Sequence, residues 1–138
     1  MARWTCPRCD REFGRARQSH TCLPGNSVDD TFLGRPPELR EAFDAVLAFV
    51  EMLGPVHADA VQVGVFLKSE RKFAELRPKT RWLACSIYVP REIVDPRVGR
   101  SLRLSSTRVV NFVKLRTVAD VDDQLCEWLA EAFDEATD

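Results

Sequence analysis

The sequence lacks any long apolar run. No stretch of the 138 residues approaches the roughly 18 apolar residues that a membrane-spanning helix needs, so we expect no membrane contact through a spanning segment. The start of the chain, Met1 to Cys6, also lacks the apolar segment of a secretory signal, and we therefore expect a cytoplasmic protein in a reducing compartment. The five cysteines are accordingly interpreted as thiols or metal ligands, not as disulfides.

Groups that typically perform catalysis are also scarce. The chain has only two histidines, and its six glycines form neither a dinucleotide-binding fingerprint nor a phosphate-binding loop. His57 follows Gly54-Pro55-Val56 and is interpreted as a turn histidine. Cys85 alternates with apolar residues and Cys126 follows Leu125, so both are interpreted as small buried hydrophobic residues. The sequence therefore favours a protein without catalytic activity and leaves catalysis open.

Opposite charges are segregated along the chain, which the formal net charge of −1 hides. Residues 62–116 carry thirteen Lys or Arg and four carboxylates, whereas residues 118–138 carry eight carboxylates and no base. Residues 1–22 are net basic and residues 23–61 net acidic. Two interpretations remain open: elements of one fold that screen one another, or a basic binding face.

The first 24 residues predict a zinc knuckle. Cys6 and Cys9 form a Cys-x2-Cys pair, and His20 and Cys22 follow as a second pair. Three thiolates and one imidazole match a tetrahedral zinc site, and four protein ligands leave no open position, so we expect a structural zinc ion. The opening resembles half of a Cys2His2 finger, but His20 and Cys22 are too close to share one helix face, which favours an extended knuckle. The nearby arginines Arg15 and Arg17 are interpreted either as partners of the thiolates and solvent or as phosphate contacts.

Residues 25–138 predict one α+β domain with two layers. Capping and periodicity indicate a helical turn after Ser27 that ends at Gly34, and long helices at about 37–53 and 118–135. β-branched and aromatic runs indicate strands at 61–68, 72–77, 81–89 and 108–115, with a long loop at 90–107 that holds at most a short strand at 102–104. We therefore expect three to four antiparallel strands flanked by two long helices that pack on one sheet face.

Several segments resemble a bacterial family of domains of unknown function, number fifty-six fifty-five. They are Val63–Lys68, Lys72–Pro78, Trp82–Pro90 and Val118–Asp123. The resemblance covers nearly the whole chain and implies the same fold with a Cys-rich knuckle in front of it. It also implies a histidine before the last strand, where this chain has Asn111. Because the family has no established activity, the resemblance implies no function.

One basic segment carries the best functional signal. In this segment basic residues are interleaved with aromatic ones, namely Lys68, Arg71, Lys72 and Arg81 with Phe66, Phe73 and Trp82. This combination suits single-stranded nucleic acid, because the cations neutralise phosphates and the rings stack on bases. The alternative is a hairpin with solvated cations and core-facing aromatics.

Three functions therefore remain open. The first is a non-catalytic binding or adaptor module whose partner is a protein or a nucleic acid. The second is a nucleic-acid-binding protein that uses the knuckle arginines and the basic hairpin. The third is an enzyme for a small or phosphorylated ligand, with a sheet pocket lined by Lys68, Arg81 and a carboxylate.

Overall fold

A computed structural model describes residues 4–5, 12–13, 27–61 and 63–137 of the chain. In chain order its elements are β1 (Trp4–Thr5), β2 (Glu12–Phe13), α1 (Val28–Phe32), α2 (Pro37–Leu53), β3 (His57–Val61), β4 (Gly64–Lys68), β5 (Lys72–Pro78), β6 (Leu83–Val89), β7 (Val98–Ser105), β8 (Arg108–Leu115), the 3-10 turn η1 (Val118–Asp120) and α3 (Asp123–Ala136). Strands β1 and β2 pair antiparallel with each other. The other six strands form one antiparallel sheet in the order β3-β4-β5-β6-β8-β7.

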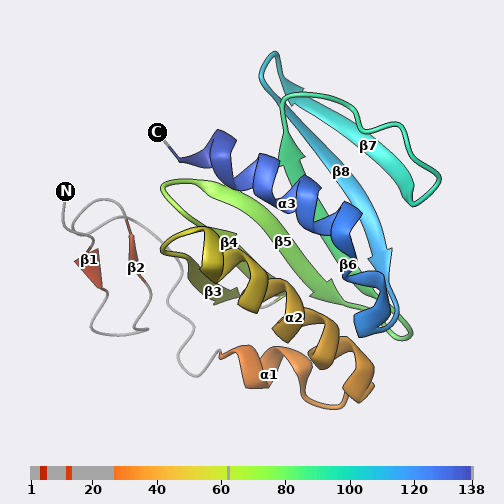
Figure 1. Cartoon of the computed structure of the whole chain (residues 1–138). Helices are drawn as coiled ribbons and strands as arrows, with labels where there is room; N and C mark the ends of the chain where they lie inside the picture. Colours follow the sequence, from red (N-terminus) through yellow and green to blue (C-terminus); the bar gives the residue numbers. More distant parts are fainter. Residues whose placement is uncertain (1–3, 6–11, 14–26, 62, 138) are drawn as a thin grey trace.

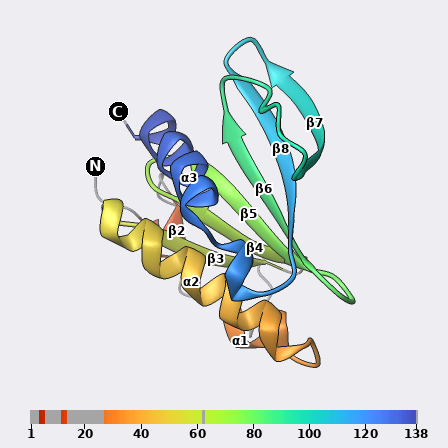
Figure 2. The same ribbon diagram turned by 45° about the vertical axis from the view of Figure 1, so that its right-hand side comes forward.

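Helices α2 and α3 lie side by side on one face of this sheet, as both ribbon views show (Figures 1 and 2). Their apolar stripes meet the sheet in a single core, which contains Phe43 and Val46 of α2, Leu125 and Leu129 of α3, and alternate residues of β4, β5, β6 and β8. Phe133 of α3 stacks edge-on against Phe73 of β5, with ring centroids 5.5 Å apart. The predicted two-layer α+β architecture, with both long helices on one face, is confirmed.

The predicted boundaries of the first two helices, which depend on capping residues, prolines and glycines next to the helix ends, are confirmed. Ser27 and Asp30 form a reciprocal capping box at α1, and Gly34 follows this short helix with a positive φ of 75°. Helix α2 runs from Pro37 to Leu53, as its proline start and Gly54 stop predict. The last helix begins later than expected. The Thr117–Asp120 box caps only the 3-10 turn η1, and the Asp122 carboxylate caps α3 through the Leu125 amide.

The predicted count of three to four strands is wrong, because the main sheet has six. The run expected at 61–68 is a hairpin of β3 and β4, in which Val61 pairs with Gly64. The region expected to be mostly loop contains β7, an eight-residue edge strand paired with β8. His57 opens β3 opposite Lys68, so its interpretation as a turn histidine is also wrong. The knuckle expected at 1–24 includes residues outside the described ones.

Candidate nucleic-acid interface

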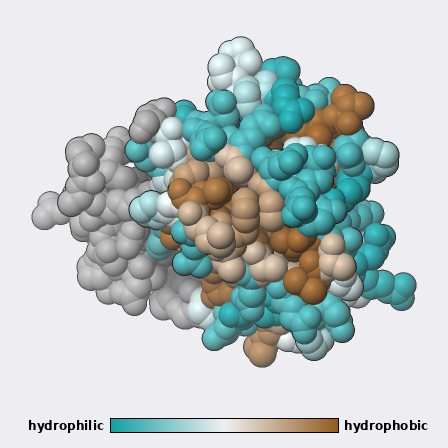
Figure 3. Space-filling view, viewed as in Figure 1, coloured by the Kyte–Doolittle hydropathy of each residue, from teal (hydrophilic) through white to brown (hydrophobic). Residues whose placement is uncertain are grey.

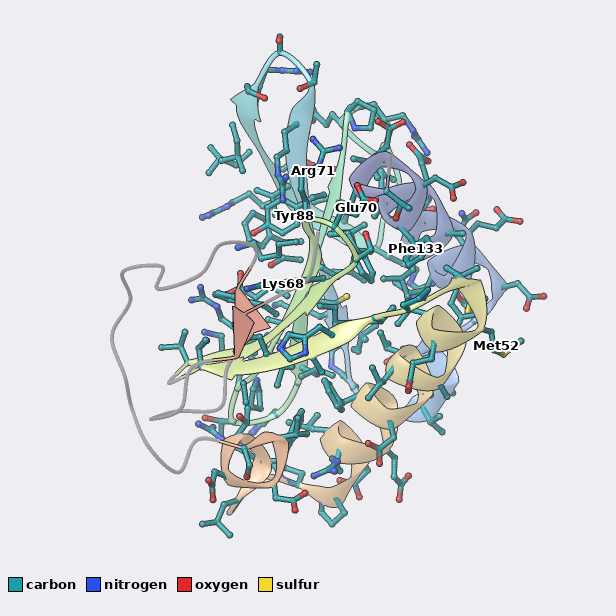
Figure 4. The ribbon with its side chains drawn as sticks, turned by 90° about the vertical axis from the view of Figure 1, so that its left-hand side faces the viewer. Met52, Lys68, Glu70, Arg71, Tyr88 and Phe133 are labelled. Atoms are coloured by element: carbon teal, nitrogen blue, oxygen red, sulfur yellow. The ribbon has the colours of Figure 1, made fainter. Side chains whose placement is uncertain are left out.

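The two faces of the sheet differ in chemistry. In β6, Leu83, Cys85, Ile87 and Val89 are buried against the helices, while Ala84, Ser86 and Tyr88 lie on the other face. Strand register places one residue of each strand in a row across that second face: Asp59, Phe66, Glu75, Ser86, Phe112 and Arg100. None of the helices that the structure describes packs on this face. In Figure 4, Tyr88 and Lys68 project from the side of the strands away from the helix residues Phe133 and Met52.

Four aromatic rings on this second face carry cations over them. Lys72 Nζ lies 4.3 Å from the ring centroid of Phe66 and 4.9 Å from that of Tyr88. The guanidinium carbon of Arg108 lies 4.5 Å from the Tyr88 centroid. We call the following set the cationic face: Lys68, Lys72, Arg77, Arg100, Arg108 and Lys114 with Phe66, Trp82, Tyr88 and Phe112.

The other two rings lie toward the opposite end of β6. The Arg100 guanidinium carbon is 4.8 Å from the Phe112 centroid, and Lys114 Nζ is 4.5 Å from the Trp82 centroid. All four rings are half-buried, so each is held by the sheet and keeps part of its surface accessible. Rigid rings with mobile cations beside them are the two components that single-stranded nucleic acid requires.

The cationic face is hollowed along β6. A central hollow of about 410 Å³ lies over Ala84 and Ser86, with Arg77 on one side and Phe112 and Arg100 on the other. A second hollow of about 640 Å³, here called the Ala84 hollow, continues from it past Lys114 to Trp82. A third, the Tyr88 hollow of about 260 Å³, lies between Lys72 and Arg108 at the other end of β6, where it also reaches Ala132, Glu135 and Ala136 of α3. The small side chains of Ala84 and Ser86 thus form the floor of a groove between larger neighbours.

Four cations of this face have no carboxylate partner within the part of the chain that the structure describes. Arg77 is paired with the buried Glu75 through Nη2 at 2.6 Å, and Lys68 Nζ lies 3.1 Å from the buried Asp59. By contrast, Lys72, Arg100, Arg108 and Lys114 form no ion pair among residues 27–61 and 63–137. Their charge is therefore available to an anionic ligand.

The helix side has the opposite charge. Carboxylates dominate the exposed positions of both helices, including Glu41 and Glu51 of α2 and Glu127 and Asp134 of α3. On this side an apolar area between α2 and α3 is bordered by hydrophilic surface (Figure 3).

Screening between elements does occur on the helix side. Arg91 Nη2 lies 2.8 Å from Glu131 Oε1, and Arg97 Nη1 lies 2.8 Å from Asp122 Oδ1. Both arginines come from the loop between β6 and β7, so the segregated charges of the sequence are partly screened there. Arg77, Arg100 and Lys114 on the far face line no described hollow with a carboxylate of α2 or α3, whereas Lys72 and Arg108 share one with Glu135 of α3. The charge segregation along the sequence thus gives the domain an acidic helix side and a basic side on the other face of the sheet.

The sequence-predicted contact residues are only partly brought together. Lys72 lies at the centre of the cationic face, and Lys68 lies on it but is paired with Asp59. Arg71 donates from Nη2 to the backbone oxygen of Glu135 at 2.6 Å and also lines the Tyr88 hollow. Arg81 is exposed in the turn between β5 and β6 and lines none of the hollows described above. Arg15 and Arg17 lie outside the described residues.

Sequence reasoning misassigned one ring and missed several side chains. Phe73 points into the core against Phe133 and is no part of the cationic face. Five side chains of the cationic face were not expected on it: Tyr88, Arg100, Arg108, Phe112 and Lys114. The alternation of buried and less buried residues along β6 and along β8 could have identified Tyr88 and Phe112, because each lies between core residues of its own strand and therefore points to the other face. Arg100 had no such signal, since its strand β7 was expected to be mostly loop.

Two further predictions concern the cysteines. Cys85 is fully buried, and burial raises the pKa of its thiol to about 12. Cys126 is half-buried, and burial followed by the nearby Asp123 and Asp122 raises its pKa as well. The interpretation as buried hydrophobic residue is confirmed for Cys85, and a thiol with a raised pKa is a poor nucleophile. Lys68 and Arg81, expected to line an enzyme pocket together, line no common hollow among those found in the described residues.

The predicted zinc ligands Cys6, Cys9, His20 and Cys22 lie outside the described residues, so the zinc site stays a prediction. Within the described residues, no group of three or more His, Cys, Asp or Glu side chains is placed to hold a metal ion.

A family model matches residues 28–136, which is most of the chain and all of the two-layer domain. The chain belongs to the family of domains of unknown function DUF5655. The resemblance noted from the sequence is thereby confirmed for this domain. No curated protein and no solved structure matches the chain significantly. The described helices of this DUF5655 domain include none long and apolar enough to cross a bilayer.

Proposed function

We propose that this DUF5655 protein is a non-catalytic binding protein whose cationic face takes single-stranded nucleic acid. The observation that carries the proposal is the row of four half-buried aromatic rings, each with a cation above it, along a groove floored by Ala84 and Ser86. This proposal selects the second of the three functions that the sequence left open, and it moves the contact surface from the hairpin to the whole sheet.

Electrostatics favour this face over the helix side of the domain. A polyanion approaching the helix side meets the carboxylates of α2 and α3, whereas the cationic face offers four cations without carboxylate partners in the described domain. Such an asymmetric field orients a polyanion before contact and raises its association rate at low salt. The orientation of the ligand is therefore a consequence of the same charge segregation that is visible in the sequence.

Base stacking requires that the cations leave the rings. A cation over an aromatic ring at an exposed site contributes about 0.5–1 kcal/mol. Stacking of a base on an aromatic side chain contributes about 1–3 kcal/mol. The exchange is favourable, because the displaced Lys or Arg then neutralises the phosphate next to the stacked base. The cation–ring contacts thus keep the cations beside the rings and can be replaced by a stacked base.

The predicted zinc knuckle has a place in this proposal. Arg15 and Arg17 would add phosphate contacts, and the structural zinc ion would make this arm rigid enough to present them. The knuckle would then extend the surface of the domain without reading sequence by itself.

Fluorescence anisotropy of labelled oligothymidine and oligouridine tests the proposal, with the full chain at low salt and rising salt. We expect binding that weakens steeply with salt. Arg100→Glu should weaken binding by at least about tenfold, which corresponds to about 1.4 kcal/mol. No binding of either oligonucleotide at low salt would overturn the proposal.

Arg103→Glu is the matched control. Arg103 lies three residues from Arg100 in the same strand and is equally an exposed arginine, but it pairs with Val109 and lies on the other face. Its Nη1 donates hydrogen bonds to the backbone oxygens of Ser105 and Ser106. An equal loss in both variants would show a general charge effect and would contradict binding at the cationic face.

A further inference from the structure

The two ends of the groove along β6 differ in a way that assigns them different roles. At the Tyr88 end, Lys72 and Arg108 both lie within 5 Å of the one Tyr88 ring, in the smallest of the three hollows. At the other end, Trp82 and Phe112 carry one cation each and border the largest hollow. Room and free ring surface are therefore greatest at the Trp82 end.

Two rings, Trp82 and Phe112, border the Ala84 hollow, and we call the space between them the slot. Ala84 pairs with Lys114, and Phe112 pairs with Ser86, two residues further along β6. Trp82 lies two residues from Ala84 in the opposite direction, so the methyl group of Ala84 forms a low floor between the two taller rings. A flat apolar ligand that enters this slot can therefore contact both Trp82 and Phe112.

The charged groups around the slot favour an anionic substituent on that ligand. Arg100 and Lys114 border the slot without a carboxylate partner in the described domain, and the exposed Arg116 lies at its rim. The one carboxylate of the lining, Asp120, already accepts hydrogen bonds from the backbone amides of Arg116 and Thr117. Arg97 is likewise engaged, because it binds both carboxylate oxygens of Asp122.

We propose that the Ala84 hollow binds one nucleobase between Trp82 and Phe112, with the attached phosphate on Arg100 and Lys114. The smallest ligand is then a nucleoside monophosphate, and the same site takes one nucleotide unit of a strand. This inference rests on the proposed function in that it names the nucleotide unit that the groove recognises. In the smaller Tyr88 hollow, in contrast, Lys72 and Arg108 contact a phosphate, although Glu135 also lines this hollow.

Gly99 provides a test that changes no charge. It is the extra residue of a β-bulge between Val98 and Arg100, it lines the hollow, and a Cβ added there meets no atom within 4 Å. Gly99→Phe therefore adds a ring at the wall of the hollow without a clash at Cβ. Val94→Phe is the matched control, because Val94 is 93% exposed on the loop before β7.

The experiment titrates the full chain with adenosine 5′-monophosphate and follows binding by calorimetry and by tryptophan fluorescence. We expect saturable binding, a loss of at least tenfold in affinity for Gly99→Phe, and unchanged affinity for Val94→Phe. Trp82→Phe should still bind the monophosphate in the calorimeter but should lose the fluorescence change. Trp128 should not contribute to this change, because it is 4% exposed in the core. Adenosine and inorganic phosphate alone should each bind more weakly than the monophosphate.

Two results of this titration would overturn the inference. The first is wild-type affinity of Gly99→Phe for the monophosphate, and the second is a fluorescence change that persists in Trp82→Phe. Where Gly99→Phe fails to fold by circular dichroism, Trp82→Leu removes the stacking ring, keeps every charge and should show the same loss. Salt-dependent oligonucleotide binding that Gly99→Phe leaves intact would refute this inference and leave the proposed function standing, whereas absence of oligonucleotide binding refutes the proposed function.

Discussion

Asn111, in the middle of β8, accepts a hydrogen bond on Oδ1 from the backbone N–H of Ile93 at 2.9 Å. The same oxygen accepts from Ser101 Oγ at 2.6 Å, and Nδ2 donates to the backbone oxygen of Arg91 at 3.2 Å. Asn111 is fully buried on the helix side of the sheet. One side chain therefore fastens the loop between β6 and β7, and also β7 itself, to the central sheet.

Asn111→Ala should destabilise the domain by about 3 kcal/mol, because each buried partner left without a hydrogen bond costs about 1–3 kcal/mol. Urea unfolding measures this change. Ser101→Ala removes only one of the three bonds and should cost about 1 kcal/mol. A free energy of unfolding for Asn111→Ala equal to that of the wild type would contradict this structural role.

The pKa of the Asp122 carboxyl is lowered, first by the hydrogen bond from the Leu125 amide and then by the Arg97 guanidinium. A carboxyl with a lowered pKa in the folded state stabilises the protein above its unfolded pKa of 3.8. This stabilisation is lost as the pH falls through the folded-state value.

Asp122→Asn keeps the capping oxygen and loses the charge. It should be less stable than the wild type at neutral pH, and the difference should vanish as the pH falls well below 3.8. Thermal unfolding at several pH values measures both. Asp123→Asn, one residue later in the first turn of α3, is the control, because Asp123 forms no ion pair within the described residues. A stability difference for Asp122→Asn that is constant with pH would be inconsistent with this account.

The parts of the fold that followed from the sequence are those with local signals. The stripe of α2 and the alternation of β6 are set by neighbours three to four or two residues apart, and both were predicted. Strand β3 was missed because its residues include two alanines and an aspartate in place of β-branched side chains. Strand β7 was missed because it is an edge strand exposed at most positions, so no buried face imposes an apolar alternation on it.

The candidate site depends on pairings that no local pattern specifies. Phe112 lies beside Ser86 because β8, and not β7, follows β6 in the sheet, with β7 added outside it. A hairpin read in chain order would have placed β7 next to β6. The sequence therefore predicted that a basic and aromatic surface exists, and strand order decided which of its residues share a face.

Thiol reactivity tests the predicted zinc knuckle together with the buried cysteine. If Cys6, Cys9 and Cys22 bind zinc, a thiol reagent should modify them only after a chelator removes one zinc ion per chain, because zinc-bound thiolates are protected. Cys126 should react slowly in the native protein, and Cys85 only in denaturant, since its thiol pKa is raised to about 12. Metal analysis that finds no zinc would exclude the knuckle. Fast reaction of the Cys6, Cys9 and Cys22 thiols before chelation would exclude it as well. Cys85→Ala is the control for the denaturant step.

The salt dependence of oligonucleotide binding should resolve the Tyr88 hollow as a phosphate contact. For single strands, the logarithm of the affinity falls against the logarithm of the salt concentration with a slope of about −0.7 per phosphate neutralised. Lys72→Gln removes the Lys72 charge next to Tyr88 and should make the slope shallower by about 0.7. Arg108→Gln should do the same, although it also loses the anchoring bond from Nη2 to the Lys72 backbone oxygen. Arg103→Gln, on the other face, should leave the slope as it is. A slope unchanged by Lys72→Gln would mean that the nucleic acid does not reach this end of the groove, because every contacted phosphate must release its counterions.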